Sequence, residues 1–250
     1  MKDVGYELIE FDTVESTNAI AKDLMFLDQE ITVFTASHQT SGVGRQGRVW
    51  ESAKGMGLWL SIVVGSEIEL SKIPTISFVA AIAVNSMLRE YIGLNSELKW
   101  PNDILVKGRK ICGILTETNN DGTRIVIGIG LNISHHEGDF PDGINATSIF
   151  LENGKSYSPN DLLPVLMEYF EKEYSIFKAE CSEKGYSETT IEHWLEHNAT
   201  IGSVVEFTLN DAQKQGTAVG VNKEGHLIIN TSEGNFVNLI SGEIQVLTKD

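Results

Sequence analysis

Positive charge is scarce in this chain. Its 250 residues include 19 lysines and arginines against 35 aspartates and glutamates, which gives a formal net charge of −16 at pH 7. A protein that binds nucleic acid regardless of sequence needs a basic face to neutralise phosphates, and binding to an anionic membrane surface makes the same demand. The composition therefore predicts that neither DNA nor a membrane is a partner of this protein.

Cysteines and long apolar runs are scarce as well. The two cysteines, Cys112 and Cys181, form no CxxC or CxH pattern. We therefore expect buried free thiols in a reducing compartment, and neither a disulfide framework nor a zinc site. No apolar run approaches the roughly 20 residues needed to cross a bilayer, and the first residues lack the apolar core of a signal peptide. These features predict a cytoplasmic protein.

A hydrophobic content of 41% is enough for a substantial core. Apolar spacing predicts mixed strands and helices up to about residue 198, with mostly antiparallel neighbours and a hairpin turn at Lys107-Gly108. Strands are expected at 31–36, 58–64, 104–106, 111–118 and 123–129; helices are expected after Ser16-Thr17-Asn18 (with Leu24 and Leu27 on the apolar face), at 76–91, from Ser158-Pro159 to Phe177, and around Ile191 to Leu195.

The pattern changes near Gly202. From there the chain has only short alternating runs separated by glycines, which is typical of a small β-barrel. Its five strands are expected at 204–209, 217–221, 227–230, 236–239 and 244–247. The expected fold class is therefore α+β, with a larger domain at residues 1–198 followed by a small barrel domain at residues 199–250.

Two short segments carry most of the functional information. Residues 39–50 place Arg45 and Arg48 in a glycine-rich stretch, where backbone N–H groups and guanidinium groups can hold carboxylate or phosphate oxygens. Residues 99–103 end in an Asn-Asp pair that follows a proline and so lies outside a helix. The basic cluster at 107–110 adds positive charge to an acidic chain. Together these segments predict a site for an anionic ligand.

Other motif matches in the chain are less specific. Gly42, Gly44 and Gly47 satisfy G-x-G-x-x-G, but neither the strand before them nor the helix after them that a Rossmann site requires is expected, and no kinase motif follows. Residues 193–197 spell H-x-x-E-H; we expect Trp194 and Leu195 to pack inward while the histidines and glutamate face water. His135 and His136 are expected in a solvated loop.

Five motifs occur in a fixed order along the chain: Ser16-Thr17-Asn18, Gln39 with the loop 42–50, Lys99-Trp100-Pro101-Asn102-Asp103, residues 109–115 and residues 128–132. In these motifs the chain resembles the biotin protein ligase family, and the resemblance covers nearly its whole length. Ser241-Gly242-Glu243 also resembles the small C-terminal domain of that family. The resemblance implies a catalytic domain with the fold of class II aminoacyl-tRNA synthetases and biotin/lipoate ligases, followed by an SH3-like β-barrel.

The resemblance also implies a two-step reaction. Biotin attacks the α-phosphate of ATP, with Mg²⁺, to give biotinyl-5′-AMP and pyrophosphate; a lysine of a biotin carboxyl carrier protein domain then takes the biotinyl group. Because Ser16 comes so early in the chain, we expect no DNA-binding domain and a monofunctional ligase. A homodimer is one alternative for its oligomeric state.

Roles for individual residues follow from the resemblance. Catalytic roles fall to Arg45, Arg48, Lys110 and Asp103, with Lys110 nearest the reacting carboxylate and Asp103 beside the incoming lysine amine. Biotin would contact Ser16, Thr17, Asn18, Gln39, Gly44, Arg45, Lys110 and Gly113. The nucleotide would contact Arg45, Arg48, Trp50, Asn102, Lys110 and Asn132, with Trp50 packing near the adenine. No residue is assigned as a dedicated metal ligand.

One position departs from the family pattern. Loops of this family commonly contain G-R-G-R-x-G, whereas Val43 stands here in place of the first arginine. We expect this change to raise the rate at which the adenylate escapes. Two alternative functions stay open at the level of sequence: a lipoate or other acyl-protein ligase that uses the same adenylate chemistry, and a non-catalytic biotin-binding protein.

Overall fold

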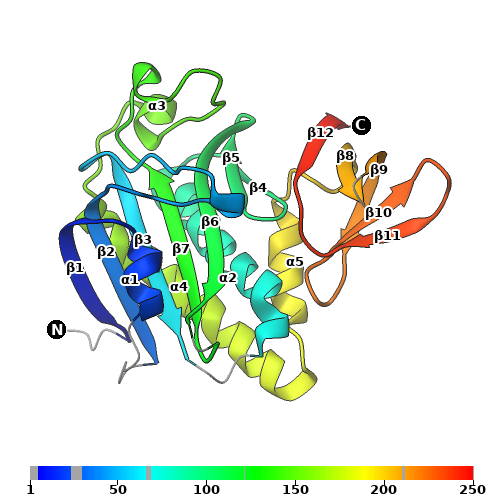
Figure 1. Cartoon of the computed structure of the whole chain (residues 1–250), viewed down its shortest axis with the longest axis horizontal. Helices are drawn as coiled ribbons and strands as arrows, with labels where there is room; N and C mark the ends of the chain where they lie inside the picture. Colours follow the sequence, from blue (N-terminus) through cyan, green and yellow to red (C-terminus); the bar gives the residue numbers. More distant parts are fainter. Residues whose placement is uncertain (1–4, 24–29, 66–68, 121, 210–211, 250) are drawn as a thin grey trace.

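Two β-sheets form the frame of the protein, seen in a computed structural model that describes residues 5–23, 30–65, 69–120, 122–209 and 212–249 (Figure 1). The first sheet has seven strands in the order β1-β2-β3-β7-β6-β5-β4. Its strands are β1 (Glu7–Val14), β2 (Ile31–Gln39), β3 (Gly57–Val64), β4 (Ser96–Lys99), β5 (Asp103–Val106), β6 (Arg109–Thr118) and β7 (Ile125–Asn132). The predicted α+β fold class is confirmed.

Within this sheet the neighbours are antiparallel, except that β1 and β2 run parallel. The predicted strands are all present, and the hairpin between β5 and β6 turns at Lys107 and Gly108, both at positive φ. Strands β1 and β4 were not predicted. They form the two edges of the sheet; β1 exposes most of its residues and β4 is only four residues long, so neither shows a clear apolar alternation.

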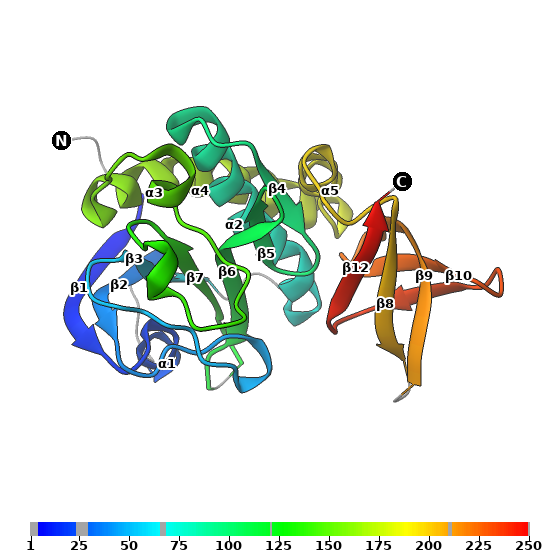
Figure 2. The same ribbon diagram turned by 90° about the horizontal axis from the view of Figure 1, so that it is seen from above.

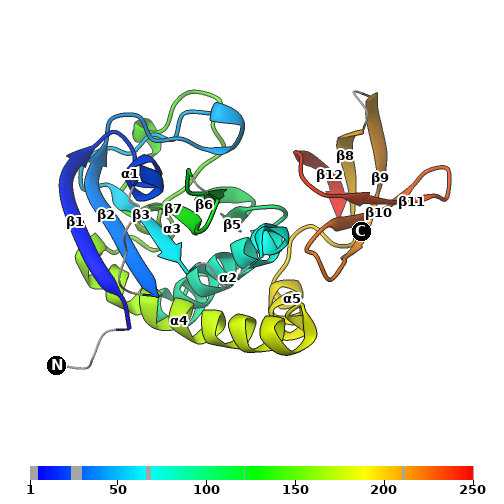
Figure 3. The ribbon, with the colours of Figure 1, turned by 60° about the horizontal axis from the view of Figure 1, so that its bottom comes forward.

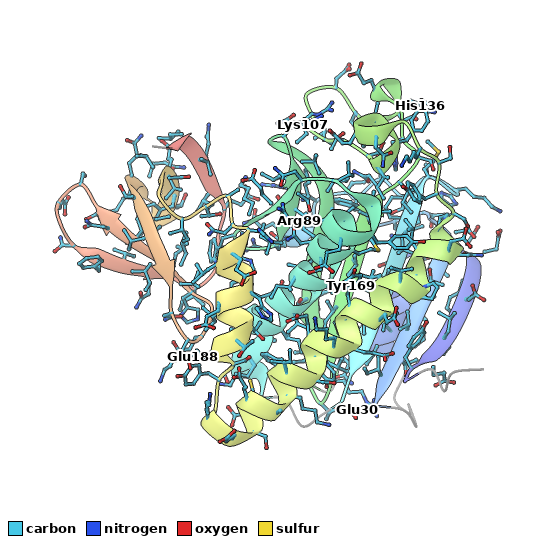
Figure 4. The ribbon with its side chains drawn as sticks, turned by 180° about the vertical axis from the view of Figure 1, so that it is seen from behind. Glu30, Arg89, Lys107, His136, Tyr169 and Glu188 are labelled. Atoms are coloured by element: carbon cyan, nitrogen blue, oxygen red, sulfur yellow. The ribbon has the colours of Figure 1, made fainter. Side chains whose placement is uncertain are left out.

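Helices cover both faces of the seven-stranded sheet. The helices are α1 (Thr17–Asp23), α2 (Ile73–Ser86), α3 (Ile149–Asn153), α4 (Pro159–Lys184) and α5 (Glu188–Glu196), and a π-helical segment, Met87–Ile92, continues α2. Helices α2 and α4 pack on one face, where they bury the main core, while α1 packs on the other (Figures 3 and 4). On β3, Ile62 faces the main core and Val63 faces α1, as the two-residue period of a strand requires.

The ends of the helices agree with the sequence prediction only in part, since α2 begins at Ile73 and α4 continues to Lys184. Gly93 adopts the left-handed conformation (φ 81°) after the π-helical segment, so that the helical run stops before it. Pro159 opens α4, although the Ser158 side chain makes no capping hydrogen bond there. Helix α1 is present but begins at Thr17, inside the cluster that was expected to precede it, whereas Leu24 and Leu27, predicted on its apolar face, lie outside the described residues. Among the residues that the structure describes, no helix is long and apolar enough to span a membrane.

The second sheet is antiparallel, with the strand order β11-β10-β9-β8-β12, and lies beside α5 (Figure 2). Its strands are β8 (Ser203–Leu209), β9 (Ala212–Val221), β10 (Leu227–Thr231), β11 (Phe236–Leu239) and β12 (Ile244–Lys249), which confirms all five predictions. The buried Trp100 links it to the first sheet: its Nε1 donates to Gly225 O at 3.1 Å and its backbone N to Thr200 Oγ1 at 2.9 Å. The division at residues 198 and 199 stays a prediction.

Two predictions about histidines were wrong. His135 is not solvated: it is 3% exposed and stacks on Phe140 with ring centroids 5.0 Å apart. Its burial lowers the pKa of the imidazole. His193 does not simply face water, because its Nδ1 lies 3.0 Å from Oε2 of the buried Glu173 on α4. The His193 contact joins two separate helices, and the His135 contact lies in an irregular segment. Local periodicity predicts neither kind of contact.

The two cysteines are free thiols, as predicted. Cys112 on β6 is buried in the main core, and this burial raises the pKa of its thiol. Cys181 on α4 is only half-buried, so the prediction of burial holds fully for Cys112 alone.

Glu152 on α3 ties the chain that follows β7 to the β5–β6 hairpin. Its buried carboxylate accepts hydrogen bonds from Arg109 Nη2 at 2.7 Å and Thr147 Oγ1 at 2.8 Å, and pairs with Lys107 Nζ at 3.0 Å. Burial by itself acts to raise the pKa of Glu152, but these three partners outweigh it and hold the pKa below its ordinary value.

We expect Glu152→Gln to lower the free energy of unfolding by about 1–3 kcal/mol at pH 7, because charge-assisted hydrogen bonds to a buried group are lost. The stabilisation from Glu152 is complete above the ordinary glutamate pKa of about 4.3 and disappears as the pH falls through the lowered pKa of the folded protein. Urea unfolding at several pH values measures it. The wild type should lose more stability than the variant between neutral and acid pH; parallel curves would contradict the assignment.

Candidate functional site

A pocket of about 650 Å³ opens over the seven-stranded sheet and gathers residues from both sheets. It is lined by every residue that the sequence assigned to the site: Ser16, Thr17, Asn18, Gln39, Gly44, Arg45, Arg48, Trp50, Asn102, Asp103, Lys110, Gly113 and Asn132. These residues come from α1, β2, the loop that follows β2, and strands β5, β6 and β7. The structure thus brings the separate motifs together in one cavity.

Two glycines form the floor on which the Trp50 ring lies. Gly113 on β6 and Gly130 on β7 are direct register partners. A Cβ atom at Gly130 would lie 2.4 Å from Trp50 Nε1, and one at Gly113 would lie 2.9 Å from Trp50 Cζ3. Lys110 Nζ lies 5.1 Å from the centroid of the same ring. Because no larger residue fits at these two positions without moving the ring, the glycines set the place of Trp50.

The glycine-arginine loop, residues 42–50, closes on itself as a small hairpin. Gly44 N donates to Arg48 O at 2.7 Å and Trp50 N donates to Gly42 O at 2.8 Å. Val43 and Val49 pair as an isolated bridge, and both side chains are exposed. Hydrogen bonds within residues 42–50 therefore fix the loop backbone from which Arg45 reaches the pocket.

Charged groups from distant segments meet at one end of the pocket. Lys110 Nζ lies 2.6 Å from Asp103 Oδ1, and Arg45 donates to Asn102 Oδ1 at 3.3 Å. Burial lowers the pKa of Arg45, while the carboxylates of Asp103 and Glu243 act in the opposite direction. The guanidinium group stays protonated all the same, as arginines in proteins do. Arg45, Arg48 and Lys110 thus line one cavity, together with Lys99.

Glu243 is a site residue that the sequence did not assign. It lies just before β12 in the second sheet, lines the pocket and forms an ion pair with Arg48. The resemblance of Ser241-Gly242-Glu243 to a family segment was the available signal, but it did not indicate that this carboxylate reaches the arginine loop. Through this pair the second sheet contributes to the pocket wall.

The pocket also has a polar wall in which Asn18 has a fixed orientation. Asn18 Nδ2 donates to Glu117 Oε2 at 2.9 Å and to Leu115 O at 3.3 Å, so both of its N–H bonds are used. Its Oδ1 accepts from Ser61 Oγ at 2.5 Å. The remaining capacity of Asn18 is a lone pair on Oδ1, which can accept a hydrogen bond from a ligand.

Gln39 offers the complementary group. Its Oε1 accepts from Thr17 N at 2.8 Å and lies 3.1 Å from Thr17 Oγ1, which fixes the direction of the amide. Its Nε2 donates to Ser52 Oγ at 2.8 Å, so one N–H is left for a ligand. The wall therefore combines one free acceptor with one free donor, which is the pattern that a neutral amide or urea group complements.

Asn102 and Asn132 are held by the backbone of neighbouring segments. Asn102 Nδ2 donates to Ile114 O at 2.7 Å, and Ile114 N donates to the backbone oxygen of Asn102 at 2.9 Å. Asn132 Nδ2 donates to Thr147 O at 3.0 Å. These hydrogen bonds use the Nδ2 group of each asparagine, so neither amide oxygen takes part in them.

Comparisons with known proteins agree with this geometry. The model of the biotin/lipoate A/B protein ligase family matches residues 10–133, and the model of the biotin protein ligase C terminal domain matches residues 200–247. The bifunctional ligase/repressor BirA of Bacillus subtilis (strain 168) is 33% identical over 249 residues, which cover 97% of this chain and 75% of the relative.

Two further relatives extend the likeness. The biotin–[acetyl-CoA-carboxylase] ligase of Paracoccus denitrificans is 28% identical over 89% of this chain and 94% of its own length. The structure of the biotin protein ligase from Aquifex aeolicus in complex with biotin and ATP has a TM-score of 0.81 and 26% identity, and the match covers 96% of this chain and 98% of that one. This chain therefore belongs to the biotin protein ligase family.

Proposed function

We propose that this protein attaches biotin, at the expense of ATP, to a specific lysine of a biotin carboxyl carrier domain, through biotinyl-5′-AMP. The observation that carries the proposal is the polarity of the pocket: a neutral wall with one free donor and one free acceptor shares one cavity with the cationic side chains of Arg45, Arg48 and Lys110. Biotin has a ureido group at one end and a carboxylate at the other. Relatives named biotin–[acetyl-CoA-carboxylase] ligase support the same acceptor.

In the first step, a carboxylate oxygen of biotin forms a bond to the α-phosphorus of ATP and pyrophosphate leaves. The approach of two anions is unfavourable, and Lys110, Arg45 and Arg48 offset it because their charges are already in place in the cavity. Lys110 sits beside the Trp50 ring and Asp103, where it can bind the reacting carboxylate. Trp50 would pack near the adenine and help exclude water from the mixed anhydride.

Magnesium would enter with the nucleotide. Among the residues that the structure describes, no three His, Cys, Asp or Glu side chains gather as a metal site, and Mg²⁺ commonly binds through substrate phosphates with one or two protein oxygens. The amide oxygen of Asn132 in the pocket fits such a contact. When bound, the ion neutralises charge on the phosphates.

In the second step, the amine of the acceptor lysine attacks the carbonyl carbon of the anhydride, AMP leaves, and the nitrogen loses a proton. Asp103 is a carboxylate of the pocket lining that lies beside Lys110, and it can accept this proton or orient the amine once Lys110 has turned from it to the ligand. Cytoplasmic location stays a prediction, and a homodimer stays one alternative for the oligomeric state.

The test is pyrophosphate release by the purified protein with MgATP and biotin, beside lipoate and octanoate, followed by labelling of a carrier domain. Biotin-specific release with labelling of the carrier lysine is expected. Release driven by lipoate would instead indicate a lipoate ligase. The dithiolane ring of lipoate has no group that pairs with both the donor and the acceptor of the wall. Biotin binding without release would indicate a binding protein.

We expect Val43→Arg to slow the loss of biotinyl-5′-AMP from the enzyme by about two- to tenfold, since a charge-assisted contact to the ligand is worth about 0.5–1.5 kcal/mol at a half-exposed position. Val43 is exposed at the pocket rim, so the arginine can be accommodated without disturbing the core. Release of preformed labelled adenylate in a rapid-dilution experiment measures the rate. Equal or faster escape from the variant would refute the idea.

A further inference from the structure

We infer that Glu117, which does not contact the pocket, determines which acid the enzyme accepts by holding the Asn18 amide in one orientation; the inference rests on the proposed function. Glu117 lies on β6 outside the residues that line the pocket. Its Oε2 accepts from Asn18 Nδ2 at 2.9 Å, while its Oε1 pairs with Lys22 Nζ at 2.9 Å. The carboxylate is thus fixed from two sides and reaches the ligand only through Asn18.

An ionised carboxylate can only accept hydrogen bonds, and this decides the direction of the Asn18 amide. The NH₂ group must face Glu117 and Leu115 O, and the oxygen must face Ser61 Oγ, 2.5 Å away. Reversing the amide would place its oxygen against two acceptors. Ser61 is fully buried on β3 and also contacts Thr17 Oγ1 at 2.7 Å, so it fixes the wall from below.

This orientation has a consequence for specificity. Because both N–H bonds of Asn18 are used, the group of the ligand that meets Asn18 must be a hydrogen-bond donor, such as a ureido N–H. An acid whose head has no donor leaves the buried Asn18 oxygen without that bond, and such a mismatch discriminates strongly. Asn18 is 6% exposed, so water satisfies the oxygen poorly in its place.

A direct catalytic role for Glu117 does not fit its position. Lys110 and Glu117 lie on the same strand, seven residues apart, which corresponds to roughly 23 Å along an extended chain. A carboxylate so far from the reacting groups cannot move a proton there. Glu117 is therefore a positioning residue, and the effect of its substitution should appear in the binding of the acid and not in the chemical step.

The experiment measures steady-state pyrophosphate release by Glu117→Gln. An amide at position 117 would turn its oxygen toward the Lys22 ammonium and its NH₂ toward Asn18, which favours reversal of the Asn18 amide. The KM for biotin should rise about tenfold, as expected for loss of a hydrogen bond to a charged group, while kcat and the KM for ATP should stay within about twofold. Calorimetric binding of biotin without ATP should weaken by a similar factor.

Two comparisons separate this role from a merely structural one. In an Asn18→Ala background, Glu117→Gln should cause no further change in the KM for biotin, because the residue through which Glu117 acts is gone. Glu206→Gln, at a half-buried glutamate on β8 away from the pocket, should leave all parameters unchanged. If Glu117→Gln folds poorly by thermal melting, Ser61→Ala tests the other support of Asn18 and should also raise the KM for biotin selectively.

An equal rise of the KM for biotin in both backgrounds, or a parallel loss of kcat, would overturn the inference. Failure of the proposed function is a distinct outcome: the wild type would then release no pyrophosphate with biotin. In that event the calorimetric comparison of wild type, Glu117→Gln and the double variant still tests whether Glu117 controls binding of a urea head group; unchanged biotin affinity would overturn it.

Discussion

Lys110→Met is expected to lower kcat for biotin-dependent pyrophosphate release by about 10²–10³-fold, the usual effect of removing one preorganised charge that stabilises a transition state. Lys110 Nζ lies 2.6 Å from Asp103 and 5.1 Å from the centre of the Trp50 ring. Methionine keeps a similar length and an apolar stem against the ring, so the substitution removes mainly the charge. It also leaves Asp103 without its cation, which adds repulsion toward the substrate anions.

Lys107→Met is the matched control for this substitution. Lys107 belongs to the same hairpin, is 74% exposed and is absent from the pocket lining; Figure 4 shows it on the outer edge of the molecule. The kcat of Lys107→Met should stay within about twofold of the wild type. Loss of the pairing between Lys107 and Glu152 should lower the stability only slightly. A loss of less than about fivefold in Lys110→Met, or an equal loss in the control, would mean that another residue supplies the essential charge.

The site was largely predictable because its strongest signals are local. Each of these signals can be identified from a few consecutive residues: the glycines that allow close approach, the arginines between them, and Asn102-Asp103 after a proline. Lys110 and Gly113 both belong to β6, and the structure places them with Trp50 in one pocket. Antiparallel pairing of β6 with β7 explains why such motifs meet although they are separated along the chain.

The residues that sequence reasoning missed act through contacts between distant segments. Glu243 reaches Arg48 from the second sheet, and Glu117 meets Asn18 from 99 residues away. Ser61 is an ordinary small residue within a buried strand, where nothing local marks it as part of a polar wall. The two edge strands were missed for different reasons: β1 exposes most of its residues, which removes the alternation that identifies a strand, and β4 has only four residues. Local patterns therefore predict elements and motifs, while the orientation of polar groups comes only from packing.

Gly130→Ala is expected to lower kcat/KM for pyrophosphate release by about 30- to 100-fold, since a displacement of about 1 Å in a positioning group can cost a factor of 10². The added Cβ would lie 2.4 Å from Trp50 Nε1 and 2.5 Å from Trp50 Cε2. The ring cannot stay on the floor formed by Gly113 and Gly130, so the loop that carries Arg45 and Arg48 must shift with it.

Gly220→Ala provides the comparison, because a Cβ at this β9 glycine meets no heavy atom within 4 Å. It should leave the rate unchanged. Fluorescence then identifies the cause: Trp59, Trp100 and Trp194 are at most 1% exposed, although Trp100 also lines the pocket, so a change in the exposure of Trp50 dominates a shift of the emission. Before any ligand is added, emission of Gly130→Ala should lie to the red of the wild type, since a displaced ring meets more water. Loss of activity with unchanged emission would show that the glycine acts otherwise than by placing Trp50.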